Sequence, residues 1–321
     1  MPAPLTRRGN PALTREELVN ILTMPLVQAN VVLNSGVRIY DAPTAVPLKI
    51  PKISQISASD WYAEGETIAD SEAPTDYLTL LPPTLKSVKT WLPMSSEVIR
   101  NSPLALDAAM RDQLVFSVSR LLEIAFFTGD STPDTHGNTT PQGMLNWTGT
   151  QKVDMAGDVP GLDDFAHMIT LLENAFATPK VFWMTPSMWN NVRTLKDTLE
   201  RPLLNPQPAA QTPKSLWGVP VVTSVHLAEA TGGQSSVILA DTDYIAVGRD
   251  NAPEARLFTE TLAKNDEIAL RVTARYDIGA IWPQAVVIMQ NAAYDTGITG
   301  MGVTAEGEGG ARTTARKVTR K

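Results

Sequence analysis

The sequence has no cysteine and only three histidines among its 321 residues. The missing cysteine excludes disulfides, thiolate catalysis and zinc or iron–sulfur sites with Cys ligands. His136, His167 and His226 lie far apart along the chain, and none belongs to a metal-binding pattern such as H-E-x-x-H. We therefore expect these histidines to be structural or exposed, and we expect no metal site.

Motifs for nucleophilic catalysis and for nucleotide binding are also missing. There is no G-x-S-x-G nucleophile elbow and no G-x-x-x-x-G-K-[ST] phosphate loop. GITGMG at 297–302 has the wrong spacing for a dinucleotide site and no helical pattern after it. Asp241 and Asp243 stand where a turn or a strand edge favours Asp. The sequence therefore predicts no enzyme and no cofactor, and a cytosolic hydrolase with an α/β lobe would lack both nucleophile and base.

Long apolar runs and an excess of basic charge are absent as well. The most apolar run, AIWPQAVVIM at 280–289, has about half the length needed to cross a bilayer, and the start of the chain has no clean signal-peptide core. The net charge of −7 argues against a general nucleic-acid binder. With 43% hydrophobic and 19% charged residues, the composition predicts a soluble cytosolic protein of two lobes without membrane contact.

The first 35 residues have the pattern of an arm. Thr14 and Glu17 fit a capping box, Leu18 and Leu22 continue an apolar stripe, and Pro25 ends the helix. So short a helix is marginal by itself. We expect it to become ordered only by packing on another surface, such as a neighbouring subunit.

The next segment, 36–92, has the composition of β-strands and encloses an acidic stretch. DWYAEGETIADSEAPTD at 60–76 contains six acidic residues and no basic one. Several prolines stand in or beside the flanking strands, and a central strand cannot lose that many amide donors. The pattern therefore predicts edge strands of a projecting ribbon. A solvated surface loop is the alternative for the acidic stretch.

A long helix is predicted after this segment. Asn101 or Ser102 caps it, and Gly129 ends it. About 26 residues at 1.5 Å each give a rod of about 40 Å. The apolar stripe expected to face the core consists of Met110, Leu114, Val118, Leu121 and Ala125.

The second half alternates helices and strands. We expect a helix at 162–177 with Phe165, Ile169, Leu172 and Phe176 on its buried face, then the strand KVFWM, then a helix at 186–199. SLWGVPVVTSV and SSVILADTDYIAVG follow as strands, and a hairpin is predicted around 264–266. The chain ends with ARTTARKVTRK, which has five positive charges in eleven residues.

Taken in order, several of these stretches resemble the major capsid proteins of tailed bacteriophages, the Hong Kong 97-like capsid fold family. DWYAEGETIADSEAPTDYLTLLPPTLKSVKTWLPMSSEVIRNSP resembles the extended loop, its returning strand and the cap of the spine helix. FFTGD followed by PQGML resembles the exit from that helix. FWMTPSMWNNVRTLKDTLERPLL, LWGVPVVTSVHL and VILADTDYIAVG resemble the axial domain. The resemblance covers about residues 36–290.

The resemblance implies an α+β fold with peripheral and axial domains. The expected divisions are an N-terminal arm at 1–35, the extended loop and its strands at 36–92, a peripheral domain with the spine helix at 93–150, an axial domain at 151–253, peripheral return strands at 254–293 and a basic tail at 294–321.

The resemblance also implies a function. The chain is expected to form hexamers and pentamers that close into an icosahedral shell around packaged double-stranded DNA, assembled in the cytoplasm of a bacterial host. Its expected partners are other copies of itself, a portal, separate scaffolding and decoration proteins, and DNA through non-specific contacts. The alternative within this fold is the shell of an encapsulin-type nanocompartment.

The acidic stretch would then reach over a neighbouring subunit and pair with basic groups there. The expected contact residues are Asp60, Trp61, Tyr62, Glu64, Glu66, Asp70, Glu72 and Asp76. The candidate basic partners are Arg7, Arg8, Arg15, Arg111 and Arg120. Three roles stay open for the tail residues, which could touch DNA, bind an acidic neighbour or form a solvated end: Arg312, Arg316, Lys317, Arg320 and Lys321.

The sequence departs from part of the family at one chemically important point. Some members cross-link their shells through an isopeptide bond from a lysine of the extended loop, but 60–76 contains no lysine. We therefore expect non-covalent contacts or a decoration protein to hold the shell together.

Overall fold

The structure is a computed structural model of the chain. It describes residues 30–42, 47–53, 61, 64–65, 75–82, 87–95, 105–132, 139–196, 199, 201, 203, 214–227, 229–230, 234–250, 254–258 and 266–294. The helix expected at 14–25 and almost all of the basic tail lie outside these residues. Within them, one seven-stranded sheet, two three-stranded sheets and a two-stranded ribbon combine with helices into an α+β fold.

The seven-stranded sheet is covered on both faces. Its strands, in spatial order, are β5 (Gln151–Asp154), β15 (Val286–Ala293), β10 (Gln234–Ala240), β6 (Val181–Met184), β8 (Val219–Thr223) and β7 (Ser215–Leu216), with β9 (Glu229–Ala230) paired to β10. Phe182 and Met184 pack into the core under α4 and α5, whereas Val181 and Trp183 pack into the core that contains α3. Because successive side chains of a strand point to opposite faces, the apolar run KVFWM follows from this double burial.

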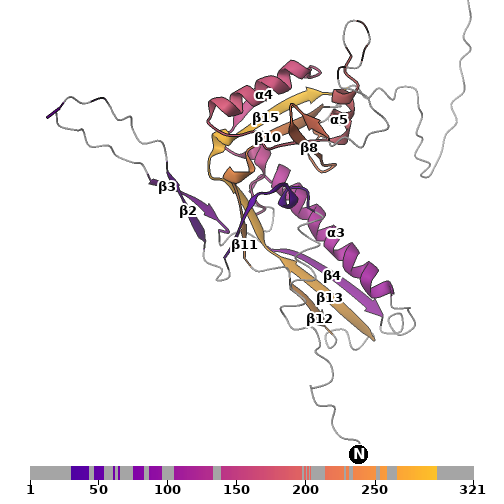
Figure 1. Cartoon of the computed structure of the whole chain (residues 1–321). Coiled ribbons are helices and arrows are strands. Elements are labelled where there is room, and N and C mark those ends of the chain that lie inside the picture. The colour runs from indigo at the N-terminus through magenta and orange to yellow at the C-terminus, as the bar shows by residue number, and fades with distance from the viewer. Residues whose placement is uncertain are drawn as a thin grey trace, which may run out of the picture.

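The helices α4 (Leu162–Asn174) and α5 (Pro186–Arg193) cover one face of this sheet. Figure 1 shows α4 over β15 and β10. The N–H of Gly161 donates to Oδ2 of Asp164 (2.8 Å) at the start of α4, and Oγ1 of Thr185 accepts from the Met188 N–H (3.2 Å) at the start of α5. Both helices are shorter than expected.

The end of α4 corrects one prediction. Phe176 was expected on the buried face, but the helix ends at Asn174 and Phe176 is 95% exposed. The helical spacing that placed it beside Leu172 no longer applies once the backbone leaves the helix.

The other face of the sheet meets α3 (Ala105–Thr128), the expected long helix. Leu114, Val118, Leu122 and Phe126 of α3 are buried, at intervals of four. This spacing moves Leu121 to the border of the contact face, where it is 48% exposed, so its predicted place in the core is wrong. Neither α3 nor any other helix of the described residues is long and apolar enough to cross a membrane.

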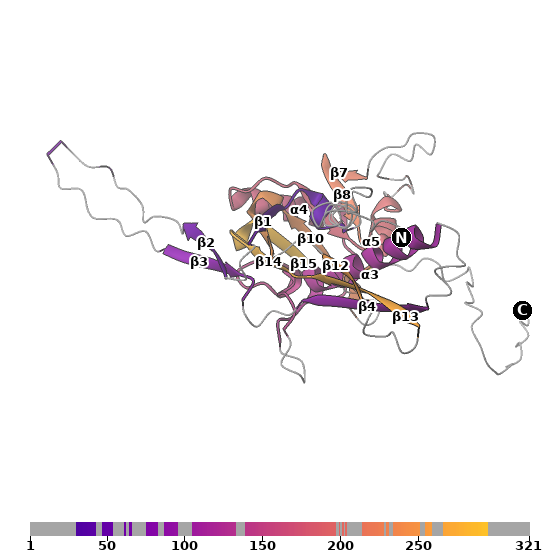
Figure 2. The same ribbon diagram turned by 90° about the horizontal axis from the view of Figure 1, so that it is seen from below.

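A three-stranded sheet lies along α3. It consists of β12 (Glu254–Phe258), β13 (Glu267–Ala274) and β4 (Val88–Ser95) in that order, and Figure 2 shows β4 and β13 side by side next to the helix. β12 and β13 are antiparallel neighbours, as the predicted hairpin requires. Pro93 lies in β4, which is an edge strand, in keeping with the missing amide donor.

The third sheet joins segments far apart in the sequence. β1 (Arg38–Asp41) pairs with β11 (Ile245–Arg249), which pairs with β14 (Tyr276–Ala280). Strands from different expected divisions of the chain are neighbours here. β11 leaves the sheet of β10 through the turn η3 (Thr242–Tyr244), and β15, expected among the peripheral return strands, lies between β5 and β10.

Residues 30–35, expected as the end of the arm, are part of the core. Asn30 and Val32 are fully buried, and the Asn30 side chain donates to the Ser119 carbonyl of α3 (3.3 Å). Glu123 of α3 joins this segment to the seven-stranded sheet. Its carboxylate accepts from the Ser224 hydroxyl after β8 and, more weakly, from the Val31 N–H (3.5 Å).

We predict that Glu123→Ala destabilises the subunit by about 1–3 kcal/mol, because it leaves the buried Ser224 hydroxyl and the partly buried Val31 N–H without an acceptor. Denaturant unfolding of unassembled subunits measures this. Glu173→Ala, at an exposed carboxylate of α4, should change the unfolding free energy by less than about 0.5 kcal/mol. Equal effects of the two changes would contradict the role of Glu123.

Candidate assembly site: the ribbon and its root

A two-stranded ribbon projects from the body of the molecule. It consists of β2 (Leu48–Ile53) and β3 (Thr75–Leu80), which pair antiparallel from Leu48 opposite Leu80 to Ile53 opposite Thr75 (Figure 1). Pro51 lies in β2, and both strands of a two-stranded sheet have a free edge. The prediction of a ribbon built from edge strands around the acidic stretch is confirmed.

The two faces of the ribbon differ. The exposed face carries Lys49, Pro51, Tyr77 and Thr79. The opposite face carries the half-buried side chains of Leu48, Ile50 and Leu78 and the buried side chain of Leu80. This alternation follows the two-residue period of a strand. One face is therefore apolar toward the body, and the other is free for contacts with another molecule.

The structure describes three of the eight predicted ribbon residues. Trp61 is fully exposed, and Glu64 lies in an exposed turn with Gly65, whose φ of +84° suits glycine. Asp76 is exposed at the start of strand β3 and pairs in register with Lys52 of the same ribbon, so it lies where the acidic stretch meets the returning strand. Those outside the described residues are Asp60, Tyr62, Glu66, Asp70 and Glu72.

The two candidate basic partners in the described residues, Arg111 and Arg120, lie on α3 and away from the ribbon strands. Arg120 is exposed on α3, and Arg111 lies in α3. Figure 1 shows the ribbon strands and α3 on different sides of the molecule. The other candidate partners, Arg7, Arg8 and Arg15, lie outside the described residues. So do the tail residues with an open role, Arg312, Arg316, Lys317, Arg320 and Lys321.

The end of β3 packs on two glycines. Leu80 and Leu81 are buried, and a Cβ at Gly248 of β11 would lie 3.2 Å from Cβ of Leu80 and 3.3 Å from Cγ of Leu81. A Cβ at Gly279 of β14 would lie 2.8 Å from Cδ1 of Leu78. Because these two positions lack side chains, the leucines of the ribbon lie closer to this sheet than a Cβ at either position would allow without displacement. We call this contact, with the two attachments described next, the ribbon root.

Polar contacts fix the strand that enters the ribbon. The Ala42 N–H donates to the Arg249 carbonyl (2.8 Å), and the Arg249 guanidinium donates to both carboxylate oxygens of Asp41 (2.6 and 3.0 Å). The hydrogen bond with Asp41 raises the pKa of Arg249, although partial burial opposes this. Such a bidentate pair fixes direction as well as distance.

The strand that leaves the ribbon is fixed by Asp277 and Arg275. The Leu81 N–H donates to Oδ2 of Asp277 (2.7 Å), and Arg275 donates to the Pro82 carbonyl (2.9 Å). Arg275 also pairs with Asp250 (3.1 Å). Leu81 has a φ of +58°, a conformation that a bulky side chain rarely adopts, so the surrounding contacts must hold it.

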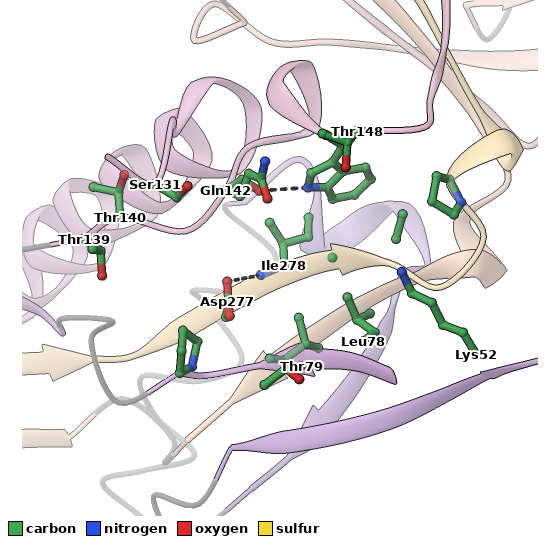
Figure 3. Close-up of a pocket in the computed structure, with 16 residues that line it drawn as sticks. Lys52, Leu78, Thr79, Ser131, Thr139, Thr140, Gln142, Thr148, Asp277 and Ile278 are labelled. Atoms are coloured by element: carbon green, nitrogen blue, oxygen red, sulfur yellow. Dashed lines mark hydrogen bonds between the residues drawn. The ribbon is translucent and has the colours of Figure 1, made fainter. Parts of the chain in front are cut away.

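Burial raises the pKa of Asp277, while the hydrogen bonds from the Leu81 and Ile278 amides and the charge of Arg275 oppose that rise. Its second oxygen accepts from the Ile278 N–H (2.9 Å), as Figure 3 shows. Both carboxylate oxygens of Asp277 thus accept hydrogen bonds from backbone N–H groups.

A hollow of about 380 Å³ lies beside the ribbon root. Figure 3 shows it between β3, β14 and the loop after α3, with the hydroxyls of Ser131, Thr139 and Thr140 along that loop. Lys52 and Asp277 are the charged residues of its lining. Both carboxylate oxygens of Asp277 accept hydrogen bonds from backbone amides, and the lining residues include no nucleophile paired with a base. The hollow is therefore open space beside the ribbon rather than a catalytic arrangement.

The carboxylate pair Asp241 and Asp243 has a structural explanation. Asp241 is buried, accepts from the Thr178 N–H (3.1 Å) and the Asp243 N–H (3.1 Å), and pairs with Lys180 (3.1 Å). Asp243 also pairs with Lys180, which lowers the pKa of Asp243. Within the described part of the chain, no group of three or more His, Asp or Glu side chains could hold a metal ion.

Exposed aromatic residues form contacts that the sequence reading did not single out. On the side of β4 and β13 away from α3, Trp91 lies 5.4 Å from Phe258 between ring centroids, and the guanidinium of Arg271 lies 4.8 Å from the Phe258 ring. Trp91 is 44% exposed, and Phe116 on α3 and Tyr77 on the ribbon are more than half exposed. In both strands an aromatic residue stands among the polar residues that alternate with the apolar ones, and this pattern could have indicated Tyr77 and Trp91 as exposed contact residues.

We predict that Gly279→Ala destabilises the ribbon root by about 1–3 kcal/mol, since the new methyl group overlaps the Leu78 and Leu80 side chains. The measurement is denaturant unfolding of unassembled subunits. Leu78→Ala in the same chain should reduce this penalty in a double-mutant cycle, because it removes the overlapping atoms. Strictly additive effects would contradict the contact.

Asp277 also predicts a pH dependence. A carboxyl whose folded pKa is raised stabilises the fold below its ordinary pKa and loses that contribution as the pH rises through the folded pKa. The unfolding free energy of wild type minus that of Asp277→Asn should therefore fall as pH rises across this window. Asp243→Asn is the control with opposite sign, because its lowered pKa makes the wild-type advantage grow as pH rises. The same slope for both would contradict the assignment.

Comparisons with known proteins agree with this architecture. A curated relative, the capsid polyprotein of Pseudomonas phage PAJU2, is 25% identical over 252 residues, which are 75% of this chain. The chain spans 36% of that polyprotein's length. Among solved structures, the capsid of a native GTA particle has a TM-score of 0.66 at 17% identity, covering 82% of this chain and 90% of the other.

A structure from Mycobacterium phage Adephagia has a TM-score of 0.65 at 16% identity and covers 81% of this chain and 89% of the other. These likenesses establish the Hong Kong 97-like fold. The model of the phage capsid family matches residues 16–291, which is most of the chain. The chain therefore belongs to the phage capsid family.

Proposed function

We propose that the chain is the major capsid protein of a tailed bacteriophage, a structural protein that assembles with copies of itself. Its hexamers and pentamers would close into an icosahedral shell around double-stranded DNA. The observation that supports this most is the match of the capsid family over residues 16–291. No arrangement in the described residues favours an enzyme or a nanocompartment shell over this function.

The ribbon is proposed as the part that joins neighbouring subunits. Its root is fixed by buried leucines on glycines and by charged hydrogen bonds, while its outer face and Trp61 are free of contacts with the body. A rigid root aims the ribbon, so that side chains of the acidic stretch meet a neighbour in a defined register. Trp61 supplies apolar contact area there.

The acidic side chains are proposed to pair with basic groups of the neighbour. Arg120 on α3 is the candidate with an exposed side chain in the structure, and the others are Arg111 of α3 and the arm residues Arg7, Arg8 and Arg15. Each such pair contributes only about 0–1 kcal/mol and is screened by salt. Repeated around closed rings, the pairs would set the register and reversibility of assembly more than its strength.

Further partners follow from the same proposal. A portal at one vertex, a separate scaffold, a decoration protein and non-specific contacts of the basic tail with DNA belong to it, as does assembly in the host cytoplasm.

Negative-stain electron microscopy of the protein expressed in bacteria tests the proposal that the chain assembles into closed shells. Closed shells are the expected result, and a chain that stays monomeric at all salt and protein concentrations would contradict it.

We predict that changing Glu64, Glu66 and Asp70 together to Lys leaves the subunit folded and prevents or misdirects shell assembly, because attraction to the basic neighbour becomes repulsion. Circular dichroism checks folding, and electron microscopy with sedimentation checks assembly.

The matched control changes three exposed acids of the body, Asp158, Asp163 and Asp266, to Lys and so alters the net charge by the same amount. It should still form shells. Normal particles from the ribbon variant, or equal loss in both variants, would count against the ribbon contact.

A further inference from the structure

The C-terminal end of α4 carries an aromatic residue at a position that favours glycine. The Phe176 N–H donates to the Glu173 carbonyl (2.9 Å) and the Ala177 N–H to the Leu172 carbonyl (3.2 Å), which together form a Schellman motif. Phe176 has a φ of +57° in this motif, where glycine is usual because a Cβ is unfavourable. Its ring is 95% exposed, so it stabilises nothing within the subunit.

The turn between β7 and β8 shows the same feature. Leu216 pairs with Val219, so Trp217 and Gly218 form a two-residue hairpin loop. Their φ values are +47° and +81°, as in a type I′ turn, whose first position favours Asn, Asp or Gly. Trp217 occupies that position and is 54% exposed. Again a large aromatic side chain stands where backbone preference opposes it.

The two aromatic residues lie at the same end of the seven-stranded sheet. Strands β6 and β8 are adjacent and parallel, with Phe182 opposite Val221. Phe176 precedes β6 and Trp217 precedes β8, so both turns stand at the amino ends of these strands. Among the described non-glycine residues with positive φ, these are the two aromatic ones.

We propose that Phe176 and Trp217 form a contact surface for a second copy of this chain, next to the ribbon contact. This inference rests on the proposed shell-forming function. Each residue opposes its local backbone preference and exposes apolar area, so its benefit must come from a molecule that covers it. Large aromatic side chains that become buried between subunits are frequent centres of binding energy.

The position of the surface indicates the same kind of partner as the ribbon. β6 is antiparallel to β10, which is antiparallel to β15, so β6 and β15 run in the same direction. Figure 1 shows β15 starting on the side of the molecule from which the ribbon projects. A copy that receives the ribbon on that side is thus the neighbour placed to cover Phe176 and Trp217.

The test uses the full-length chain with Phe176→Gly and Trp217→Asn, singly and together. Both changes suit the turn backbone, so the melting temperature of unassembled subunits should stay unchanged or rise by about 2 °C. The subunit concentration needed for assembly, measured by sedimentation and electron microscopy, should rise about tenfold or more for each. A substitution that merely destabilises the fold would lower subunit stability, so it would not combine equal or greater stability with weaker assembly.

Two kinds of control make the outcome specific. Phe176→Tyr and Trp217→Phe keep an aromatic ring and should assemble close to wild type. Val159→Ser removes an exposed apolar side chain before the opposite end of α4 and should leave assembly unchanged. The inference is overturned if the double variant assembles like wild type, or if Val159→Ser weakens assembly equally. Failure of the wild-type chain to form shells would instead refute the proposed function.

Discussion

The close approach of the ribbon to the β1–β11–β14 sheet is the contact on which the rest of the arrangement depends. Leu80 and Leu81 lie against Gly248 and Gly279 because no side chain occupies the space between them. Charged hydrogen bonds from Arg249 and Arg275 attach the two strands of the ribbon on either side of this contact. Packing gives the root its stability, and the directional hydrogen bonds give it an orientation. A ribbon held only by packing could slide, and one held only by surface ion pairs would be weak.

A second constraint connects this root to the remainder of the subunit. The seven-stranded sheet is buried on both faces, so α3 and α4 share the same strands through alternate side chains. Glu123 ties α3 to Ser224 beyond β8 and to the segment at Val31. Because cores at native density transmit small displacements, these ties make the subunit a stiff body that carries a directed ribbon. Stiffness of this kind suits a protein whose copies must meet repeatedly in one geometry.

Different residues account for the stability of the subunit and for its proposed assembly. Buried positions such as Trp183 and Phe126 follow the ordinary rules of core packing. Phe176 and Trp217 break the rules of turn chemistry and lie exposed. Local rules are usually broken where function requires it, and these two turns fit that pattern.

Local patterns determined much of this protein. The prolines predicted edge strands, the periodic apolar residues and Gly129 predicted α3, and the missing motifs argued against catalysis. Only the tertiary structure decided that β15 lies between β5 and β10, that β1 pairs with β11, and that Leu81 meets Asp277. The physical reason is the sequence separation over which each kind of interaction acts. Propensity, capping and periodicity act within a few residues, whereas these pairs join segments more than 40 and up to about 200 residues apart, whose choice depends on which surfaces the whole chain can bury together.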